Sequence, residues 1–514
     1  MRRERPNGLA TAAIALMVSG GWLAPSPAAA DDEAVDKGRY ISIAADCVAC
    51  HQAPDGTPYA GGHVLKTPFG DLAVPNITPD ADTGIGSWTY DDFEGAVRRG
   101  VGHDGELLYP AMPYPHYTGM TDDDVAALWA YMQTVTPVTN AVDVNRLPFP
   151  FDVRDSLYVW RALYFEPARF KTDSSATKEV NRGAYLVEVL GHCGDCHTPR
   201  DALGAEIKAE ALQGAAIEEW YAPDISNGPD SLIADWSVEQ LAAFLGGADQ
   251  SARHPAFGEM LAVVGELAQL REDDVQAMAA FLKSRTPDEP SQHRSPGHEA
   301  SADELALGEE IFVASCTSCH QTDGEGDPGL AASLVGNGGV IAAQPFNVIA
   351  VVLEGMAPQG DYGVMPSFHE ALTDSQIAAV TNYVRTAWTN EAPANATPAM
   401  VADLRQIIGP IDGTATVAVT CPNPPADRMN DTTRTALTEL AKSRQVTADD
   451  LRPIVAAYDE SFPDLSTVDR VAALTGVYCV AAAADATANT QVLAKQVHFM
   501  NAVARVEAEQ QAQQ

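Results

Sequence analysis

The 514-residue sequence predicts an all-α protein, and three observations lead to this prediction. Amphipathic segments with apolar residues at i, i+3 and i+7 recur along the chain, as in helices that bury one face. A short motif of cysteine and histidine precedes each of three such segments. Helical spacings also continue after about residue 398. We therefore expect three tandem helical units and a mainly helical C-terminal domain.

Each unit is expected to pack an opening helix against a closing helix. The closing segments share one apolar pattern and span residues 125–132, 275–282 and 377–384. Thr121 with Asp124, and Thr373 with Gln376, have the spacing of capping boxes that start two of these segments. Each opening segment contains a glycine, whose missing Cβ lets two helix backbones approach closely: Gly38, Gly183 and Gly308.

The charge balance excludes several classes of partner. The chain has 70 acidic and 32 basic residues, a formal net charge of -38. Nucleic acids and anionic lipid surfaces are bound through Lys and Arg, so neither is expected as the main partner. The eight cysteines are too few for a disulfide-dense scaffold in a chain of this length.

The N-terminus has the organisation of a secretory signal peptide. Basic residues at positions 2, 3 and 5 precede an apolar stretch over residues 9–23, and three alanines follow at 28–30. The apolar stretch is shorter than the ~20 residues that span a bilayer, which argues against an uncleaved anchor. We therefore expect residues 1–30 to be removed on export.

The motif Cys-x-x-Cys-His occurs three times, at residues 47–51, 193–197 and 316–320. Two thiols on one helical turn can form thioether bonds to one haem, and the adjacent imidazole then faces the iron. A zinc or redox-disulfide site is the alternative, but zinc sites usually pair two such clusters, and these motifs lie far apart in sequence. We therefore predict three covalently bound haem c groups, attached through Cys47, Cys50, Cys193, Cys196, Cys316 and Cys319. The expected proximal iron ligands are His51, His197 and His320.

The second axial ligand of each iron decides between electron transfer and ligand chemistry. In each unit we expect one methionine, in a loop before the closing segment, to be the sixth ligand: Met112, Met260 and Met365. Methionine more often serves core packing, and other side chains remain alternatives. These are His63, His103 and His116 in the first unit, His254 in the second, and Met356 and His369 in the third.

The sequence segments that flank the motifs resemble those of a known family. The matching segments are 59–62 (Tyr-Ala-Gly-Gly), 74–78 (Val-Pro-Asn-Ile-Thr), 108–117 (Leu-Tyr-Pro-Ala-Met-Pro-Tyr-Pro-His-Tyr), 181–187 (Asn-Arg-Gly-Ala-Tyr-Leu-Val) and 191–200 (Gly-His-Cys-Gly-Asp-Cys-His-Thr-Pro-Arg). Over about residues 34–391 the chain resembles the three-haem cytochrome c subunit of bacterial membrane-associated alcohol, gluconate and sorbitol dehydrogenase complexes. The resemblance implies three tandem class I cytochrome c domains and the same three methionine ligands.

The expected domain organisation follows from these repeats and from changes in composition. We expect a signal peptide at 1–30, cytochrome c domain 1 at 31–135, an aromatic inter-domain brace at 136–172, cytochrome c domain 2 at 173–286, a linker at 287–300, cytochrome c domain 3 at 301–391 and a C-terminal helical extension of unknown role at 398–514. A second linker is expected from 391 to 398.

The C-terminal extension contains the two cysteines that no haem motif uses, Cys421 and Cys479. In an oxidising compartment we expect them to form a disulfide; two buried free thiols are the alternative. Related dehydrogenase subunits are expected to attach to the membrane through C-terminal amphipathic helices. This long, acidic tail departs from that pattern, so membrane association is expected to be peripheral if it occurs.

The predicted function is that of a periplasmic three-haem electron carrier. It would accept electrons from a catalytic dehydrogenase subunit of the quinoprotein, flavoprotein or molybdenum type, acting on an alcohol, aldehyde or sugar, and pass them to quinone or another cytochrome. The sequence contains no nucleotide-binding glycine fingerprint and no nucleophile elbow, so the chain itself is not expected to be an enzyme. The alternatives are a stand-alone soluble shuttle and a peroxidase-like haem enzyme with one open iron.

Overall fold

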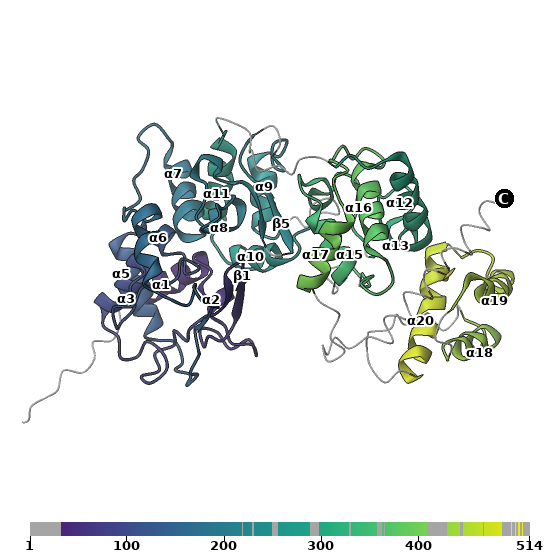
Figure 1. The fold of residues 1–514 in the computed structure, drawn as a ribbon, viewed down its shortest axis with the longest axis horizontal. Helices are drawn as coiled ribbons and strands as arrows, with labels where there is room; N and C mark the ends of the chain where they lie inside the picture. Colours follow the sequence, from purple (N-terminus) through teal and green to yellow (C-terminus); the bar gives the residue numbers. More distant parts are fainter. Residues whose placement is uncertain are drawn as a thin grey trace, which may run out of the picture.

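The computed structural model describes residues 32–514 except 218, 229–230, 249–254, 288–297, 328–329, 357–361, 364, 409–428, 443–445, 466, 486–494, 496–498, 500–501, 504–505 and 507–514. The predicted signal peptide, most of the predicted linker at 287–300, and His254 lie outside the described residues. Figure 1 shows three helical units in succession, followed by further helices near the C-terminus.

The first two units have the same order of helices. The first contains α1 (Asp32–Ala44), α2 (Cys47–His51), α3 (Tyr90–Arg99), α4 (Tyr114–Tyr117) and α5 (Asp122–Met132). After α6 (Ser156–Tyr164), the second contains α7 (Lys178–Ala184), the π-helix η1 (Tyr185–Leu190), α8 (Gly194–His197), the 3-10 helix η2 (Lys208–Glu210), α9 (Val238–Leu245), α10 (Glu259–Leu267) and α11 (Glu272–Ser284).

The third unit and the C-terminal region continue the helical pattern. The third unit contains α12 (Ala302–Ser315), α13 (Thr317–His320), α14 (Gly338–Ile341), α15 (Phe346–Glu354) and α16 (Asp374–Thr386). It is followed by α17 (Pro398–Ile408), α18 (Asp431–Leu440), α19 (Ala448–Ser461) and α20 (Thr467–Asp485). No helix in the described part of the chain is both long and apolar enough to cross a bilayer.

Two small antiparallel sheets modify the predicted all-α fold. The first pairs β1 (Val64–Thr67) with β2 (Gly70–Ala73), and β2 with β3 (Asn145–Arg146). The second pairs β4 (Gln213–Ile217) with β5 (Trp220–Asp224). These strands have two to five residues, too few for the alternating pattern that would have indicated them in the sequence.

A glycine lies at the crossing of the opening and closing helices in each unit. The helices α1 and α5, α7 and α11, and α12 and α16 pack together as pairs. A Cβ built on Gly38 or Gly183 would lie 1.9 Å from the carbonyl oxygen of Ala127 or Ala277, and one on Gly308 would lie 2.2 Å from that of Ala379. No side chain fits at such a distance, so the predicted close approach of the helices is confirmed in all three units.

The predicted capping boxes are confirmed in one case of two. At α16, the side chain of Thr373 accepts from the backbone of Gln376, and the Gln376 side chain bonds back to the Thr373 backbone. At α5, Thr121 accepts from the backbone of Asp124. The carboxylate of Asp124 instead binds Lys37 and Tyr185. A longer-range pairing has therefore replaced the second half of the box.

The first two units share one hydrophobic core and are joined by equivalent tyrosine-to-aspartate hydrogen bonds. A single cluster of buried residues includes Ile41 and Met132 of the first unit together with Leu186 and Met278 of the second. At the edge of this core, hydrogen bonds run in both directions between equivalent positions. The first two units are therefore packed together through one continuous core, as within a single domain.

The third unit contacts the second through polar and apolar groups. The side-chain amide of Asn347 on α15 accepts from the backbone N–H of Tyr221 at 2.8 Å and donates to its carbonyl oxygen at 3.0 Å. Both bonds are buried, so they fix the register between α15 and β5. Gly338 and Gly339 lie against Leu232 and Phe257 of the second unit.

The segment 391–398 is not the linker that the sequence predicts, and the extension does not begin at a free boundary. Ala396 is fully buried, and its N–H donates to the side chain of Asn382 on α16. The following helix α17 packs on α15 and α16 through Val401 and Leu404. Polar composition suggested a linker here, but the asparagines are bonded to the third unit, so α17 is part of its packing.

The rest of the C-terminal extension forms its own helical core. The helices α18, α19 and α20 pack around Leu437, Val455, Tyr458 and Leu474, as their helical spacing predicts. Among the described elements, α20 also lies against α13 of the third unit. Cys479 on α20 takes part in a disulfide bond. The predicted partner, Cys421, lies outside the described residues, so the pairing stays a prediction.

Candidate functional site

Each Cys-x-x-Cys-His motif forms or directly precedes a single helical turn. Cys47 begins α2, while Cys193 and Cys316 are the residues immediately before α8 and α13. This geometry brings the two thiols of each motif to one side of a turn, as the haem hypothesis requires. These six cysteines are free of disulfides.

The thiols of the motifs do not have the electrostatics of a reactive redox site. Burial raises the pKa of Cys47, Cys193 and Cys316 to about 12. Reactive redox cysteines instead have a lowered pKa, because the thiolate is the reactive form. The surroundings therefore favour neutral sulfur, as in a thioether, over a thiolate.

The three motif histidines are oriented by backbone carbonyl groups. The Nδ1 atoms of His51 and His197 lie 2.8 and 2.7 Å from the carbonyl oxygens of Pro75 and Pro223. The Nδ1 atom of His320 lies 3.2 Å from that of Ala332. A carbonyl oxygen only accepts, so Nδ1 carries the proton in each ring. The lone pair of each imidazole is then on Nε2, ready for a metal ion.

Burial also keeps these imidazoles neutral. It lowers the pKa of His51 to about 4 and lowers the pKa of His197 and His320, although their hydrogen bonds to carbonyl groups oppose the shift. A protonated imidazole cannot bind a metal ion. Each motif histidine is therefore in the charge state and the tautomer of an iron ligand.

The loops that present these carbonyl groups are built alike in the first two units, and the sequence reasoning did not assign them a role. After Pro75, the side chain of Asn76 accepts from the backbone and hydroxyl of Thr78. After Pro223, Asp224 accepts from Ser226 in the same way. The repeated pattern Pro-[Asn/Asp]-Ile-[Thr/Ser] at 75–78 and 223–226 was the available signal.

The three predicted methionine ligands lie in different local structures. Met112 is in a turn before α4, where its N–H donates to the carbonyl of Tyr109 and its own carbonyl accepts from Tyr114. Met260 lies in the first turn of α10, so it is a helical residue and not the loop residue that its position suggested. Met365 pairs with Met356 in an isolated antiparallel bridge. Met112 and Met260 are partly buried against the shared core.

The structure places most of the alternative ligands in other roles. His63 is exposed, and His103 stacks on Trp88 while its Nδ1 lies 3.1 Å from Asp92. Met356 stands directly opposite Met365. His369 is buried and lies 2.9 Å from Glu370 through Nδ1, but its Nε2 has no hydrogen-bond partner among the described residues. His369 therefore remains an alternative iron ligand, through its Nε2 atom.

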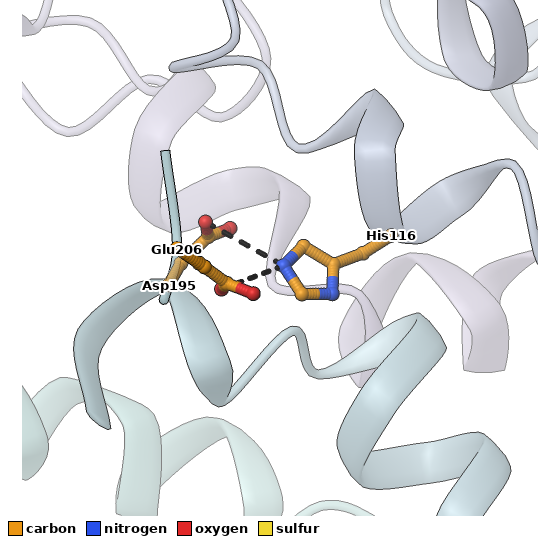
Figure 2. Close-up of side chains that lie close together, drawn as sticks. All are labelled: His116, Asp195 and Glu206. Atoms are coloured by element: carbon orange, nitrogen blue, oxygen red, sulfur yellow. Dashed lines mark hydrogen bonds and ion pairs between the residues drawn. The ribbon is translucent and has the colours of Figure 1, made fainter. Parts of the chain in front are cut away.

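His116 occupies an ion-pair cluster at the junction of the first two units. Figure 2 shows its ring from α4 facing the carboxylates of Asp195 on α8 and Glu206 beyond it. The Nε2 atom lies 3.0 Å from Glu206 and 3.6 Å from Asp195, and Nδ1 lies 2.9 Å from the carbonyl of Glu188. Burial opposes charge on this ring, but the two carboxylates raise the pKa of His116 well above its usual value.

This cluster is balanced in charge by its own residues. The three ligand-type atoms lie within 4.8 Å of one another, close enough to surround a divalent cation. However, Nδ1 donates to a carbonyl and Nε2 faces two anions, so the ring is an imidazolium that donates from both nitrogens. Arg200 adds a second cation 2.7 Å from Asp195. The cluster therefore joins the first and second units by ion pairs, beside the second haem motif.

Comparison with known proteins gives a consistent family. The family profile of cytochrome c matches residues 35–136 and 305–388. The chain is 38% identical to the cytochrome c subunit of alcohol dehydrogenase (quinone) from Gluconacetobacter polyoxogenes over 425 residues, 78% of this chain and 90% of that protein. It is 39% identical to the gluconate 2-dehydrogenase cytochrome c subunit of Pantoea cypripedii over 405 residues, 73% of this chain and 90% of the relative.

A third relative extends the comparison to another substrate class. The fructose dehydrogenase cytochrome subunit of Gluconobacter japonicus is 36% identical over 420 residues, 75% of this chain and 86% of the relative. This chain belongs to the family of cytochrome c subunits of dehydrogenases. The family resemblance predicted from the motifs is confirmed, and with it a function in electron transfer.

The residues of this cytochrome c subunit fit the haem c that its family implies. Each motif provides two thiols free of disulfides and a neutral imidazole whose protonated nitrogen is already bonded to a carbonyl group. The remaining Nε2 is the atom that binds haem iron. The cysteines and the histidine of a motif would hold the group, and the haem would supply an iron that gains and loses one electron.

Proposed function

We propose that this cytochrome c subunit carries three haem c groups and transfers electrons from a catalytic dehydrogenase subunit to quinone or another cytochrome. The observation that carries the proposal is the histidine-to-carbonyl hydrogen bond, which occurs at all three motifs, including the second. The second motif lies between the two segments that match the cytochrome c family. Its helix pair has the same glycine crossing as the other two, which supports a third cytochrome c domain.

The proposed sixth ligands are Met112, Met260 and Met365. Methionine and histidine together raise the potential relative to two histidines and leave the iron without an open position. The protein's own contribution is to hold each proximal imidazole neutral and oriented, and to bury the haem pocket from water. Because the first two units share one core, their haem motifs are held at a fixed separation, which suits transfer between neighbouring haems.

The donor is proposed to be a dehydrogenase subunit that oxidises an alcohol, aldehyde or sugar, by analogy with the relatives. We also propose that the mature chain begins near Asp31 and works in the periplasm, peripherally attached to the membrane if at all. The basis is the N-terminal sequence and the use of Cys-x-x-Cys-His motifs, which are filled outside the cytoplasm.

The experiment combines mass and spectroscopy on the purified native chain. Intact mass after denaturation is expected to show three covalent haems on a chain that starts near Asp31. Two haems would contradict the proposed middle domain. Addition of the donor's substrate to the co-purified complex should reduce all haems, and carbon monoxide should leave the reduced spectrum unchanged. A carbon monoxide complex in the wild-type protein would instead favour the haem enzyme with an open iron.

A further inference from the structure

The helix α6 is apolar on both of its faces, which is unusual for a helix at the surface. Its inner stripe consists of Leu157, Trp160, Arg161 and Tyr164, all buried or half-buried. Its outer stripe is exposed and also apolar: Tyr158, Val159, Ala162 and Leu163. Surface helices normally have charged or polar residues on the outer face, and a helix that is apolar all round is normally covered.

The inner side of this segment is firmly attached to both units. Trp160 donates from its indole N–H to the carbonyl of Leu203 at 3.0 Å. Arg161 donates to the carbonyl of Arg99 at 2.6 Å, and Arg154 donates to that of Leu107 at 2.7 Å. The exposed outer residues are thus displayed by an anchored helix, in agreement with the predicted brace but with half of its apolar surface facing outward.

The exposed apolar residues form a patch that we call the brace surface. It comprises Phe149, Phe151, Val153, Tyr158, Val159, Leu163 and Leu203, which are 82, 42, 43, 63, 65, 63 and 54% exposed. They account for seven of the twelve large hydrophobic residues exposed in the described part of the chain. Phe69 packs on Phe151 and lies against Gly204, which links the two ends of the patch. Concentrated apolar patches of this kind mark interaction sites.

The charge of the segment differs from that of the whole chain. Residues 144–171 contain five basic and three acidic residues, in a protein of net charge -38. The exposed basic residues among them are Arg146, Arg169 and Lys171, and the exposed acidic residues are Asp152, Asp155 and Glu166, so the exposed charges balance. Tyr, Trp, Phe and Arg are the residues enriched in protein interfaces. The mixture of both signs also fits a protein better than an anionic lipid surface, which selects clusters of basic residues alone.

The brace surface adjoins the loop of the first proposed iron site. The hydroxyl of Tyr109 donates to the carbonyl of Phe151 at 2.9 Å, and the ring of Tyr109 lies 4.9 Å from the guanidinium of Arg154. The carbonyl of the same Tyr109 accepts from the N–H of Met112. On the other side, Leu203 follows the second motif histidine by six residues. A partner on this surface would therefore sit beside the first two haem sites.

We propose that the brace surface is the docking site of the dehydrogenase subunit. The matching face of that subunit would be apolar at its centre and would carry charges of both signs at its rim. This inference rests on the proposed function, because it assumes that a dehydrogenase subunit is the donor. Docking here places the donor next to the haem sites of the first two units and leaves the third unit free for the acceptor.

The test compares two double variants of the haem-loaded full chain. Val159→Asp with Leu163→Asp adds two charges to the brace surface at positions whose side chains point outward. Ile407→Asp with Val480→Asp adds the same charges at residues that are 45 and 59% exposed elsewhere. Binding is measured by titration with the purified dehydrogenase subunit that reduces the wild-type haems when given its substrate, and unchanged absorption spectra verify the fold of each variant.

The brace variant should weaken binding at least about thirtyfold, as expected when central interface residues are replaced, and the control should bind like the wild type. Val159→Lys with Leu163→Lys should also weaken binding, because apolar burial is lost whatever the sign of the charge. Equal affinity of brace variant and control would overturn the docking site while leaving the dehydrogenase donor intact. Unchanged subunit binding with lost binding to phosphatidylglycerol vesicles would identify a membrane contact and refute the proposal. If no dehydrogenase subunit reduces the wild-type haems, the proposed function and the docking site both fail.

Discussion

The hydroxyl of Tyr185 in the second unit donates a hydrogen bond to the carboxylate of Asp124 in the first, and Tyr40 of the first unit makes the same bond to Asp274 of the second. The two tyrosines stand two residues after Gly183 and Gly38, and the two aspartates are the third residues of α11 and α5. Each of the two units thus donates from its tyrosine to the aspartate of the other unit, at equivalent positions of the two repeats. The third unit has Glu310 and Gln376 at these positions, so it has neither the tyrosine nor the aspartate of this bond there.

Replacing Tyr185 by Phe should destabilise the junction of the first two units. Burial and the bond to Asp124 raise the pKa of Tyr185, so the hydroxyl is a neutral donor at all ordinary pH values. Loss of a hydrogen bond to a charged group costs about 1.5–3 kcal/mol. Guanidinium unfolding followed by far-UV circular dichroism measures the change. Tyr158→Phe is the matched control, since Tyr158 is 63% exposed, and equal midpoints for the two variants would count against the interface.

Replacing Gly183 by Ala should be much more damaging than replacing Gly265 by Ala. A methyl group at Gly183 would meet the carbonyl oxygen of Ala277 at 1.9 Å, whereas one at Gly265 meets nothing within 4 Å. Separating α7 from α11 is expected to cost about 3 kcal/mol or more, as in overpacked cores. Gly265→Ala should stabilise α10 by about 0.5–1 kcal/mol. Thermal unfolding of both variants tests the contrast, and a tolerated Gly183→Ala would disprove the close crossing.

Replacing Asp46 by Asn should stabilise the protein above neutral pH. Burial raises the pKa of Asp46 to about 7, with Glu266 and Glu259 adding to the shift. The folded state therefore holds a proton that the unfolded state releases, and stability falls as pH rises from about 4 to about 7. The Asp46→Asn variant has no carboxyl group to ionise here. The excess of its free energy of unfolding over that of the wild type should therefore grow across that window to about 2–4 kcal/mol at pH 8. Asn also accepts the left-handed backbone at φ 49°.

The control for this pH effect is Asp55→Asn. Asp55 is exposed, and its hydrogen bonds to Thr57 lower its pKa, so it does not titrate between pH 5 and pH 8. The difference in denaturant midpoint between Asp46→Asn and the wild type should be larger at pH 8 than at pH 5. The difference between Asp55→Asn and the wild type should be the same at both pH values. A constant difference at both pH values would mean that Asp46 is ionised throughout.

Replacing Met365 by Leu should open the third iron to carbon monoxide while the protein stays folded. The exchange nearly conserves volume and usually costs less than about 1.5 kcal/mol in a core. Met356→Leu is the matched control, because Met356 faces Met365 across the same backbone bridge. Carbon monoxide difference spectra of the reduced variants measure the effect. Binding in Met356→Leu or in His369→Gln, with none in Met365→Leu, would reassign the ligand.

Truncation should be tolerated after α17 but not before it. A chain that ends at residue 409 keeps Val401 and Leu404 in the core of the third unit, and it keeps the ion pair between Arg405 and Asp374. A chain that ends at residue 395 loses all of these and exposes Ile349 and Leu353. Haem content and thermal unfolding of the two proteins are the measurements. Full stability of the shorter chain would place the boundary where the sequence analysis put it.

Local patterns predicted the elements whose signals are local. The Cys-x-x-Cys-His turns and the capping box at Thr373 each depend on residues within a few positions of one another, and the glycines of the helix crossings recur at the same place in each repeat. The helical position of Met260 was missed because Gly258, with φ 55°, starts α10 without a side-chain cap. The ion pairs of His116 and the burial of Ala396 depend on residues far away in the chain, for which a single sequence contains no periodic signal. The two small sheets were missed because their strands are too short to show an alternating pattern.

The third unit buries its one basic residue. Residues 298–391 contain thirteen acidic residues and one basic residue, Arg385. This guanidinium is fully buried and donates to the carbonyl groups of Val340, Ala342 and Pro393. Every charged side chain that this stretch shows to solvent is thus an anion. The third unit therefore presents charge of one sign to a partner, and the field of such a surface attracts a basic acceptor before the two surfaces touch.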